Sequence, residues 1–328
     1  MLLKYQQLTR FLNMKPSRRL FLSQASLVAG ASLLGKYLKQ DAPSGTLLSA
    51  IPGNANRLII YHTNGLNGTT GPVFKKTGGL GGINKELNSA ETGFLLDAGN
   101  FLNNGAGFDQ QKLLIQMMNN TGYKAAAAGG LDLSDGGEKL TALAAHMNFA
   151  LVNCNHRFTP ALKRIIKPYL TFKSGGLKIG ITGVCKPLKG VVYDNAIACA
   201  NRTARFLKEN ERCHVVICLS DLGSAKKDER VNDQILARTS EHIDVIIGND
   251  YGRLHNNDAV FHNKLKQEVL LVAAVGQGLT IGKTVYTFDN EKLKKGIAVS
   301  HIIPGKPTGQ KYSAALQELS LAENSLPV

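Results

Sequence analysis

The sequence predicts an α/β protein built from two mixed β-sheets. Three observations lead to this prediction. Short β-branched and apolar runs alternate with helical segments through most of the folded part, a pattern typical of strands joined by helices. Towards the C-terminus, strands with short connections replace the helical segments. Many of the 34 glycines among the 328 residues directly follow an expected strand, where the chain must turn tightly.

The expected elements follow from these patterns. Helices are predicted at 83–90, 109–120, 134–147, 194–210 and 230–239. Strands are predicted at 57–61, 93–97, 125–128, 149–153, 215–220, 244–248, 259–261, 269–275, 284–288 and 297–301. The stretches 169–172 and 177–184 flank two consecutive glycines and predict a β-hairpin. Because ligands of open α/β sheets bind at the carboxyl ends of strands, we expect the segments after the strands to meet at one edge.

The composition is that of a globular protein with a basic surface. Hydrophobic residues make up 43% and charged residues 19% of the chain, which excludes an intrinsically disordered protein. The formal net charge is +15, but the first 40 residues contain seven Lys and Arg and no acid, so the rest carries +8. No nucleic-acid-binding motif accompanies this charge, and we expect no nucleic-acid partner.

The N-terminal segment predicts export. Residues 15–22 read KPSRRLFL and resemble a twin-arginine export signal, with Arg18 and Arg19 as the paired arginines. The apolar stretch 20–35 is 16 residues long, which is short for a bilayer span and suits a signal sequence. We therefore expect a periplasmic or other extracytoplasmic protein. An uncleaved N-terminal membrane anchor is the alternative, because no clear cleavage site follows the stretch.

Four parts are expected along the chain. They are a signal or anchor at 1–35, a linker at 36–56, a folded domain at 57–305 and a C-terminal tail at 306–328. The linker is assigned from its polar composition and its two prolines, Pro43 and Pro52.

Five short segments after expected strands carry the clearest motifs. They read HTNGLNG at 62–68, LDAGNF at 96–101, AGGLD at 128–132, LSDLG at 219–223 and IGNDYG at 247–252. In this order and spacing they resemble the motifs HTNDxHG, LDAGDF, xGNHE, LSHLG and GGHxH of the calcineurin-like metallophosphoesterases, in the branch of the secreted 5′-nucleotidases. The resemblance covers roughly residues 57–304. It implies a metallophosphatase-like, four-layer α-β-β-α sandwich of two mixed sheets and, at family level, metal-dependent phosphoester hydrolysis.

None of that family's metal-binding positions keeps its ligand in this chain. Matched residue by residue, the ligands and a transition-state histidine fall on Gly65, Asn67, Asn100, Gly130, Leu131, Asp221, Asp250 and Gly252. Glycine and leucine have no ligating side chain, and asparagine is neutral. The position of the carboxylate that bridges the two metal ions is Asn100. We therefore expect no metal cofactor and a catalytically inactive pseudoenzyme with a binding or assembly role.

A rebuilt site is the alternative. Asp132, Asp221 and Asp250 are expected at the same edge, and carboxylate oxygens suit Mg²⁺ or Ca²⁺. On this hypothesis the chain is an active phosphoester or nucleotide hydrolase. Asp97 belongs to the family's own LDAG pattern and is instead expected to hydrogen-bond its loop.

Any ligand is expected at this edge. The candidate ligand-binding residues are Asn64, Asn67, Asn100, Asp132, Asp221, Asp250 and Arg253. We expect the Gly and Asn residues of these loops to expose backbone N–H groups. Without metal ions to offset the aspartates, a neutral or cationic ligand, or a partner's basic side chain, is favoured over a phosphate. Secreted members of the family carry a C-terminal domain that binds the nucleoside, so a separately encoded domain of that type, or another exported protein, is an expected partner.

Overall fold

The structure is a computed structural model that describes residues 46–47, 56–74, 76–223, 231–249 and 258–305. All of these residues belong to one compact unit, Ser44–Val328. The expected signal or anchor at 1–35 and the tail at 306–328 lie outside the described residues and stay predictions. Within the described ranges, no helix is both long and apolar enough to cross a membrane.

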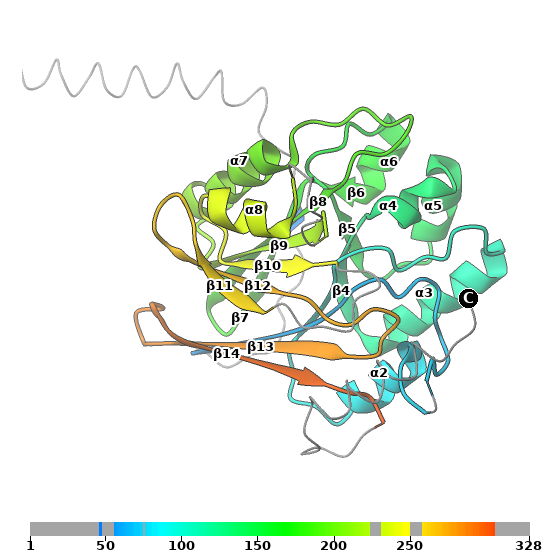
Figure 1. Ribbon diagram of the computed structural model, residues 1–328, viewed down its shortest axis with the longest axis horizontal. Coiled ribbons are helices and arrows are strands. Elements are labelled where there is room, and N and C mark those ends of the chain that lie inside the picture. The colour runs from blue at the N-terminus through cyan, green and yellow to red at the C-terminus, as the bar shows by residue number, and fades with distance from the viewer. Residues whose placement is uncertain (1–45, 48–55, 75, 224–230, 250–257, 306–328) are drawn as a thin grey trace, which may run out of the picture. The chain divides into compact units, whose positions relative to one another are not determined.

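The first sheet has seven strands in the order β14-β13-β2-β3-β4-β5-β6. They are β2 (Arg57–Thr63), β3 (Phe94–Asp97), β4 (Tyr123–Ala127), β5 (Ala150–Val152), β6 (Ile166–Lys167), β13 (Ile281–Phe288) and β14 (Lys294–Ile302). Strands β2 to β6 run parallel, and β13 and β14 continue the sheet beyond β2 as antiparallel strands. Helical crossovers join most of the parallel strands, as the alternating sequence pattern predicts (Figure 1).

The second sheet has seven strands in the order β1-β7-β8-β9-β10-β12-β11. They are β1 (Thr46–Leu47), β7 (Tyr169–Ser174), β8 (Leu177–Cys185), β9 (Val215–Asp221), β10 (Val245–Gly248), β11 (Ala259–His262) and β12 (Glu268–Val272). Strands β8, β9, β10 and β12 run parallel, whereas β7 and β11 are antiparallel to β8 and β12. The predicted hairpin is β7–β8, and it turns at Gly175 and Gly176, which both have positive φ. Strand β1 lies inside the expected linker and pairs with β7.

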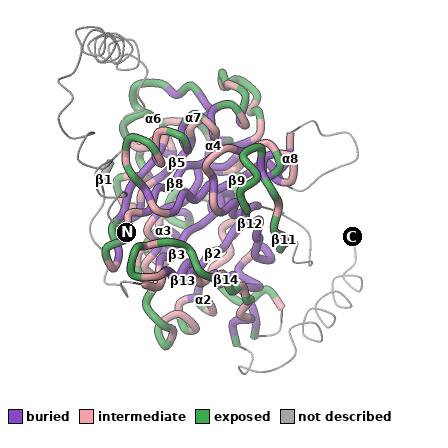
Figure 2. The backbone as a smooth tube through the Cα atoms, turned by 90° about the vertical axis from the view of Figure 1, so that its left-hand side faces the viewer, coloured by how far each residue is buried: buried purple, intermediate pink, exposed green. Residues whose placement is uncertain are grey.

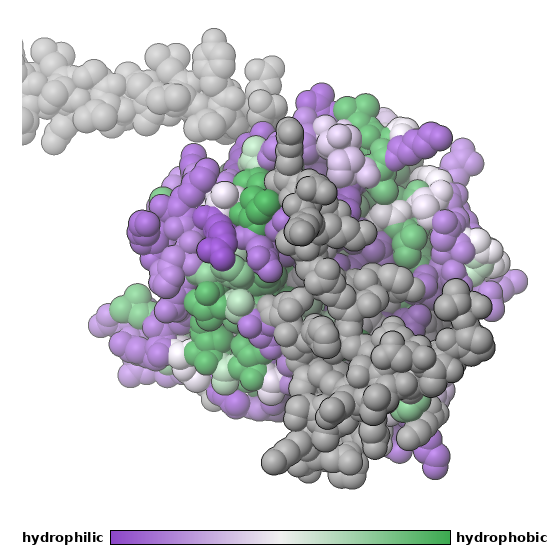
Figure 3. Space-filling model, in the orientation of Figure 1, coloured by the Kyte–Doolittle hydropathy of each residue, from purple (hydrophilic) through white to green (hydrophobic). Residues whose placement is uncertain are grey.

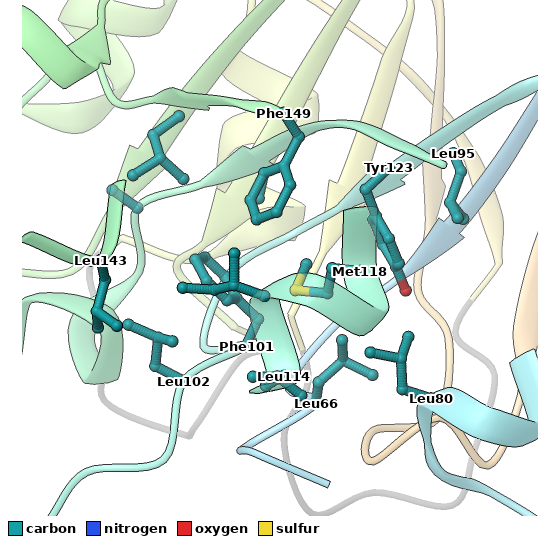
Figure 4. Close-up of a cluster of buried hydrophobic side chains, with 14 of the residues drawn as sticks. Leu66, Leu80, Leu95, Phe101, Leu102, Leu114, Met118, Tyr123, Leu143 and Phe149 are labelled. Carbon is teal, nitrogen blue, oxygen red and sulfur yellow. The ribbon is translucent and has the colours of Figure 1, made fainter. Parts of the chain in front are cut away.

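Helices cover the outer face of each sheet. The first sheet carries α2 (Gly79–Leu87), α3 (Phe108–Thr121), α4 (Gly130–Ser134), α5 (Gly137–Ala144) and α6 (Pro160–Ile165), and the second carries α7 (Ala196–Glu209) and α8 (Asp233–Thr239). Figure 4 shows part of the core under the first group, where Leu114 and Met118 of α3 lie among Leu80, Leu95 and Tyr123. Each helix therefore buries one apolar face against its sheet.

Besides the two clusters of buried side chains under the helices, a further cluster lies between the two sheets. Along β2, Leu58 and Ile60 point into this layer, whereas Ile59 points to the helices, because successive side chains alternate across a strand. Phe94 of the first sheet and Phe172 of the second meet edge to face with ring centroids 5.4 Å apart. Figure 2 shows buried residues running through both sheets. The predicted four-layer α-β-β-α sandwich of two mixed sheets is confirmed.

Three differences from the expected elements have local causes. The expected helix 134–147 is shorter and corresponds to α5 alone, because the chain turns at Gly136 with φ 96, a conformation that most residues avoid, and the preceding α4 was not expected. Helix α2 begins four residues earlier than expected, at Gly79, because glycines obscure its first turn. Helix α6 was not expected at all, although Pro160 at its first position and Thr159 as its N-cap are typical start signals.

Candidate functional site

The segments after β2, β3, β4, β9 and β10 meet at one edge of the sandwich, as predicted. The Gly65 N–H donates to the Gly99 carbonyl at 2.9 Å, which joins the loops after β2 and β3. Asn100 Nδ2 donates to Asp221 Oδ1 at 2.8 Å and so connects the first sheet to the second. Asn249, directly after β10, donates to the Gly99 carbonyl at 3.2 Å. We call this cluster the carboxyl-edge site.

Asp221 lies at the centre of the carboxyl-edge site and is only 8% exposed. Its Oδ1 accepts hydrogen bonds from Asn100 Nδ2 at 2.8 Å and from Asn249 Nδ2 at 3.0 Å. Its Oδ2 accepts from the Gly130 N–H at 2.7 Å and from the Cys185 thiol at 3.3 Å. A carboxylate has about four lone-pair positions, so these donors fill it. Burial raises the pKa of Asp221 above its ordinary value, although the hydrogen bonds oppose this.

Asn100, at the position of the bridging carboxylate, is bonded through both ends of its side-chain amide. Its Oδ1 accepts from the Leu131 N–H at 2.9 Å, while Nδ2 donates to Asp221. Its backbone is left-handed, with φ 60, which asparagine tolerates better than most residues. Gly129 permits the close approach, because a Cβ there would lie 2.6 Å from Asn100 Oδ1. The sequence Gly129-Gly130 therefore lets the start of α4 close onto the amide.

Asp132 is buried and binds backbone groups of the first sheet's loops. Its Oδ2 accepts from the N–H groups of Asn100 at 2.8 Å and Gly129 at 2.9 Å. Its Oδ1 accepts from the Leu102 N–H at 2.9 Å. Because Gly129 is the N-cap of α4 and Asp132 the third helical residue, the carboxylate also caps this helix. Burial raises the pKa of Asp132 well above its ordinary value.

Asp97 has the loop-holding role expected from the LDAG pattern. It is fully buried at the end of β3 and accepts from the Gly99 N–H at 2.8 Å and from Thr63 Oγ1 at 2.6 Å. Thr63 Oγ1 in turn lies 2.8 Å from the Tyr123 hydroxyl. Burial raises the pKa of Asp97 to about 7, against the lowering effect of its hydrogen bonds.

His62 lies near the end of β2, just before the loop that enters the carboxyl-edge site, and it is a buried, neutral histidine. It packs over Gly282 of β13, where a Cβ would lie 2.1 Å from the imidazole ring. His301 of β14 meets it edge to face, with ring centroids 6.3 Å apart. Neither ring nitrogen of His62 has a hydrogen-bond partner within the described part of the chain. Burial, and then His301, lowers the pKa of His62 to about 3.

The expected cradle of free backbone N–H groups is wrong for the described loops. Three N–H groups after β2 donate to carbonyls of the loop after β3, at 2.8 to 3.0 Å: Gly65 to Gly99, Asn67 to Asn100 and Gly68 to Phe101. Three more at the start of α4 donate to side-chain oxygens of the site: Gly129 to Asp132, Gly130 to Asp221 and Leu131 to Asn100. The glycines serve to let loops approach each other rather than to expose donors.

The described side chains do not fit a two-metal centre. Within the described ranges, no three His, Cys, Asp or Glu side chains are grouped so that they could hold a metal ion. Asn100 is neutral and directs an N–H donor at Asp221, where a two-metal centre needs a shared anion. Asp221 already accepts four hydrogen bonds, so a metal ion there would have to displace a protein donor, and Asp132 accepts three.

The candidates named from the sequence divide into two groups. Those that the structure brings together at the edge are Asn64, Gly65, Asn67, Asn100, Gly130, Leu131, Asp132 and Asp221. Those outside the described residues are Asp250, Gly252, Arg253, Arg18 and Arg19, and the predictions for them stay predictions. Asn64 is fully buried, and its Nδ2 donates to Asn249 Oδ1 at 3.3 Å. Its Oδ1 is buried and has no hydrogen-bond partner in the part of the chain that the structure describes.

Three residues of the site were not expected from the sequence, Cys185, Lys186 and Leu188. Asn249 lies in the expected segment 247–252 directly after β10, but it was not singled out as a ligand-binding residue. Cys185 resembled a core residue, and burial raises the pKa of its thiol well above the usual value, so that it is an S–H donor to Asp221. Lys186 lowers the pKa of Asp221 by its charge. Leu188 Cδ2 lies 3.3 Å from where a Cβ on Gly130 would be, so it occupies the space beside that residue.

Comparison with known proteins finds similarity to nucleotide phosphoesterases and nucleotidases. No family model matches the chain. The trifunctional nucleotide phosphoesterase protein YfkN of Bacillus subtilis is 23% identical over 317 residues, which cover 82% of this chain and 21% of that protein. The structure of a 5′-nucleotidase precursor from Thermus thermophilus is 22% identical with a TM-score of 0.65, over 82% of this chain and 59% of the other.

Two further solved structures are similar. The NAD nucleotidase of Haemophilus influenzae is 20% identical with a TM-score of 0.61, over 81% of this chain and 56% of the other. The calcineurin-like phosphoesterase YfkN of B. subtilis is 19% identical with a TM-score of 0.60, over 81% of this chain and 97% of the other. The chain thus spans about a fifth of the curated relative. It has the fold of the calcineurin-like phosphoesterases and 5′-nucleotidases over about four fifths of its length.

Proposed function

We propose that this chain is an exported, 5′-nucleotidase-like domain that does not carry out two-metal phosphoester hydrolysis and that uses its carboxyl-edge site for binding or assembly. The observation that carries the proposal is the side-chain amide of Asn100. It stands at the position of the bridging carboxylate and is bonded to Asp221 and to the Leu131 N–H. Similarity to a nucleotide phosphoesterase and to a 5′-nucleotidase supports the relation at family level.

Electrostatics explain why this one amide matters. Two dications about 4 Å apart repel each other by about 16 kcal/mol at an effective dielectric constant near 20. A shared carboxylate offsets much of that repulsion, whereas a neutral amide offsets little. In this chain the amide also directs its N–H donor into the site. A pair of metal ions would therefore meet a hydrogen-bond donor at the place where they most need an anion.

The surroundings of Asp221 support the same conclusion. Metal coordination at this carboxylate would require the loss of at least one of its four donors. The Gly130 N–H belongs to the first turn of α4 and cannot rotate away as a side chain could. Asn100 and Asn249 are held by further hydrogen bonds of their own. The network therefore stabilises the site in a closed, metal-free arrangement.

The proposed ligand carries a hydrogen-bond donor, such as an amine or a partner's Lys or Arg side chain. Asn64 Oδ1 is a buried acceptor that has no hydrogen-bond partner among the described residues, and its side chain is bonded to Asn249 at this edge. Buried polar atoms without a partner cost free energy, so a donor that reaches Asn64 would recover it. The test is calorimetric titration of the chain with agmatine and, separately, with inorganic phosphate. Tighter binding of phosphate than of agmatine would contradict this ligand class.

The proposal includes export by the twin-arginine route through Arg18 and Arg19. They are the paired arginines directly before the apolar stretch 20–35. Replacing both with Lys keeps the charge and is expected to leave the protein in the cytoplasm. Cell fractionation measures this, and an extracytoplasmic double variant would show that the route is wrong.

The proposal of inactivity is tested by hydrolysis of bis(p-nitrophenyl) phosphate and of AMP. The full chain is assayed with Mn²⁺, Zn²⁺ and Mg²⁺, beside B. subtilis YfkN as the positive control. We expect no turnover above a blank without protein. Turnover that disappears in Asp221→Ala but persists in the exposed control Glu138→Gln would contradict the proposal and favour the rebuilt hydrolase.

A further inference from the structure

Two paired loops form a second surface, next to α6. The loop after β5 and the loop after β8 lie side by side, and the Arg157 N–H donates to the Val192 carbonyl at 2.8 Å. His156 and Tyr193 form an isolated β-bridge, and their rings touch with centroids 6.4 Å apart. Figure 1 shows the loop after β8 at the top of the view, above α6. Residues far apart in the sequence thus share one surface.

Two large apolar side chains protrude from this surface. Val192 is 63% exposed and Tyr193 is 49% exposed. We call them the apolar pair. Single exposed apolar residues are normal in soluble proteins, but adjacent ones on a protruding loop expose a larger area to water. In Figure 3, hydrophobic residues lie beside strongly hydrophilic ones at the top of the molecule, where the loop and α6 are drawn.

The two loops that carry the apolar pair are basic, together with α6, which follows the first of them. Residues 153–165 and 186–195 contain five Lys and Arg and one acid, Asp194. That acid is already bonded to Arg157, with Asp194 Oδ1 2.7 Å from Arg157 Nη2. Four of these cations are exposed, Arg157, Lys163, Arg164 and Lys189, and we call them the basic surface. Among the described residues, Lys163, Arg164 and Lys189 have no ion-pair partner.

Another exposed apolar residue shows what is distinctive here. Leu293 is 57% exposed in the turn between β13 and β14. Its turn mixes charges of both signs, since Asp289 and Glu291 lie beside Lys292, and Lys295 pairs with Asp289 at 3.1 Å. The paired loops and α6 contain no acid other than Asp194, and the next acid along the chain is Glu209, at the end of α7. Exposed apolar area and uncompensated positive charge thus coincide at the paired loops but not at Leu293.

We propose that this surface docks the domain on an anionic membrane, with Val192 and Tyr193 entering the headgroup region. Lys and Arg near a bilayer are attracted by acidic headgroups, and tyrosine favours the boundary between headgroups and acyl chains. An acidic protein would attract the same cations. Protruding apolar side chains favour the bilayer, however, because a fluid layer accommodates them without a complementary pocket.

The proposal stands apart from the proposed function of the carboxyl-edge site. It uses none of the residues around Asp221 and Asn100, so hydrolytic activity there would leave it unaffected. Each Lys or Arg close to an anionic bilayer strengthens binding by about fivefold. Removing three of them should therefore weaken binding by roughly 100-fold.

A tryptophan reporter tests the docking directly, because the chain contains no Trp. The full-length Tyr193→Trp variant is mixed with vesicles of phosphatidylcholine containing 30% phosphatidylglycerol, and its emission spectrum is recorded. We expect a shift to shorter wavelength as the indole enters the headgroup region, and no shift with pure phosphatidylcholine. Leu293→Trp carries the same N-terminal segment and is the matched control, whose emission should not change.

Charge removal completes the test. In the Tyr193→Trp background, the triple change Lys163→Gln, Arg164→Gln and Lys189→Gln should weaken the vesicle-induced shift by roughly 100-fold in lipid concentration. The matched triple Lys264→Gln, Lys266→Gln and Lys295→Gln removes equal charge elsewhere and should leave the shift intact. Equal shifts from both tryptophans, equal effects of both triples, or no shift at all would overturn the proposal. A shift with poly-glutamate but not with vesicles would overturn it in favour of an acidic protein partner.

Discussion

Asp132 and Asp221 lie on either side of Asn100, and each accepts a hydrogen bond from it, yet their surroundings differ. All three donors to Asp132 are backbone N–H groups from the loops of the first sheet. Three of the four donors to Asp221 are side chains, and they come from both sheets. Asp132 therefore holds loops and caps α4. Asp221 is instead the centre of the substituted site, where side chains of both sheets meet.

The largest expected effect is loss of stability in Asp132→Ala. Three buried N–H groups would lose their acceptor at once, so the free energy of unfolding should fall by about 3 kcal/mol or more. Urea denaturation measures this. Asp135→Ala is the matched control, because Asp135 is partly exposed and pairs with Lys139, and it should cost about 1 kcal/mol. Equal losses of unfolding free energy in the two variants would contradict the structural role assigned to Asp132.

A charge exchange between Asn100 and Asp221 sharpens the comparison. Asn100→Asp alone places two carboxylates face to face and should lower the free energy of unfolding by about 2 kcal/mol. Adding Asp221→Asn restores one amide and one carboxylate, and should recover at least about 1 kcal/mol as a coupling energy. The double-mutant cycle is measured by urea denaturation. Additive effects would mean that the two side chains do not interact as the structure shows.

A smaller effect is the pH dependence of the free energy of unfolding, to which His62 and Asp97 contribute in opposite directions. The pKa of His62 is lowered from 6.5 to about 3, so its contribution to stability is present above pH 6.5 and is lost as pH falls towards 3. The pKa of Asp97 is raised to about 7, so its contribution is present below pH 3.8 and is lost as pH rises through 7. The two groups therefore act in opposite directions between about pH 4 and 6.5.

The variant His62→Leu isolates the histidine. Relative to the wild type, its free energy of unfolding should rise by at most about 1.4 kcal/mol for each unit of pH below 6.5. Denaturation at pH 7 and pH 5 gives the difference. His262→Leu, on the exposed side of β11, is the matched control variant. A constant difference between His62→Leu and the wild type would contradict the buried, neutral histidine.

Much of the fold could be predicted because strand and helix patterns are local properties of the sequence. The apolar, β-branched run of β2, the β7–β8 hairpin and the change to strands near the C-terminus all follow from neighbouring residues. The exceptions also have local causes. Gly136 delays the start of one expected helix to Gly137, and the short α6 has only Thr159 and Pro160 as start signals.

The location of the site could be predicted from the sequence, but the hydrogen-bond partners of its side chains could not. The strand ends indicated which loops meet, and the resemblance indicated which ligands are missing. The different partners of Asp132 and Asp221 depend on contacts between residues up to 121 positions apart, which no local pattern reveals. Cys185 was missed for the same reason, and the bond of Asn249 to Asp221 was not foreseen, because each acts through a carboxylate on a different strand.

Metal content tests the central claim most directly. The full chain is loaded with Mn²⁺ or Zn²⁺, desalted and measured by elemental analysis, with B. subtilis YfkN treated in the same way. Because Asn100 supplies a donor where a bridging anion is needed and Asp221 is already filled by four donors, we expect no stoichiometric metal in this chain. About two bound ions per chain, the number for a two-metal centre, would contradict the claim.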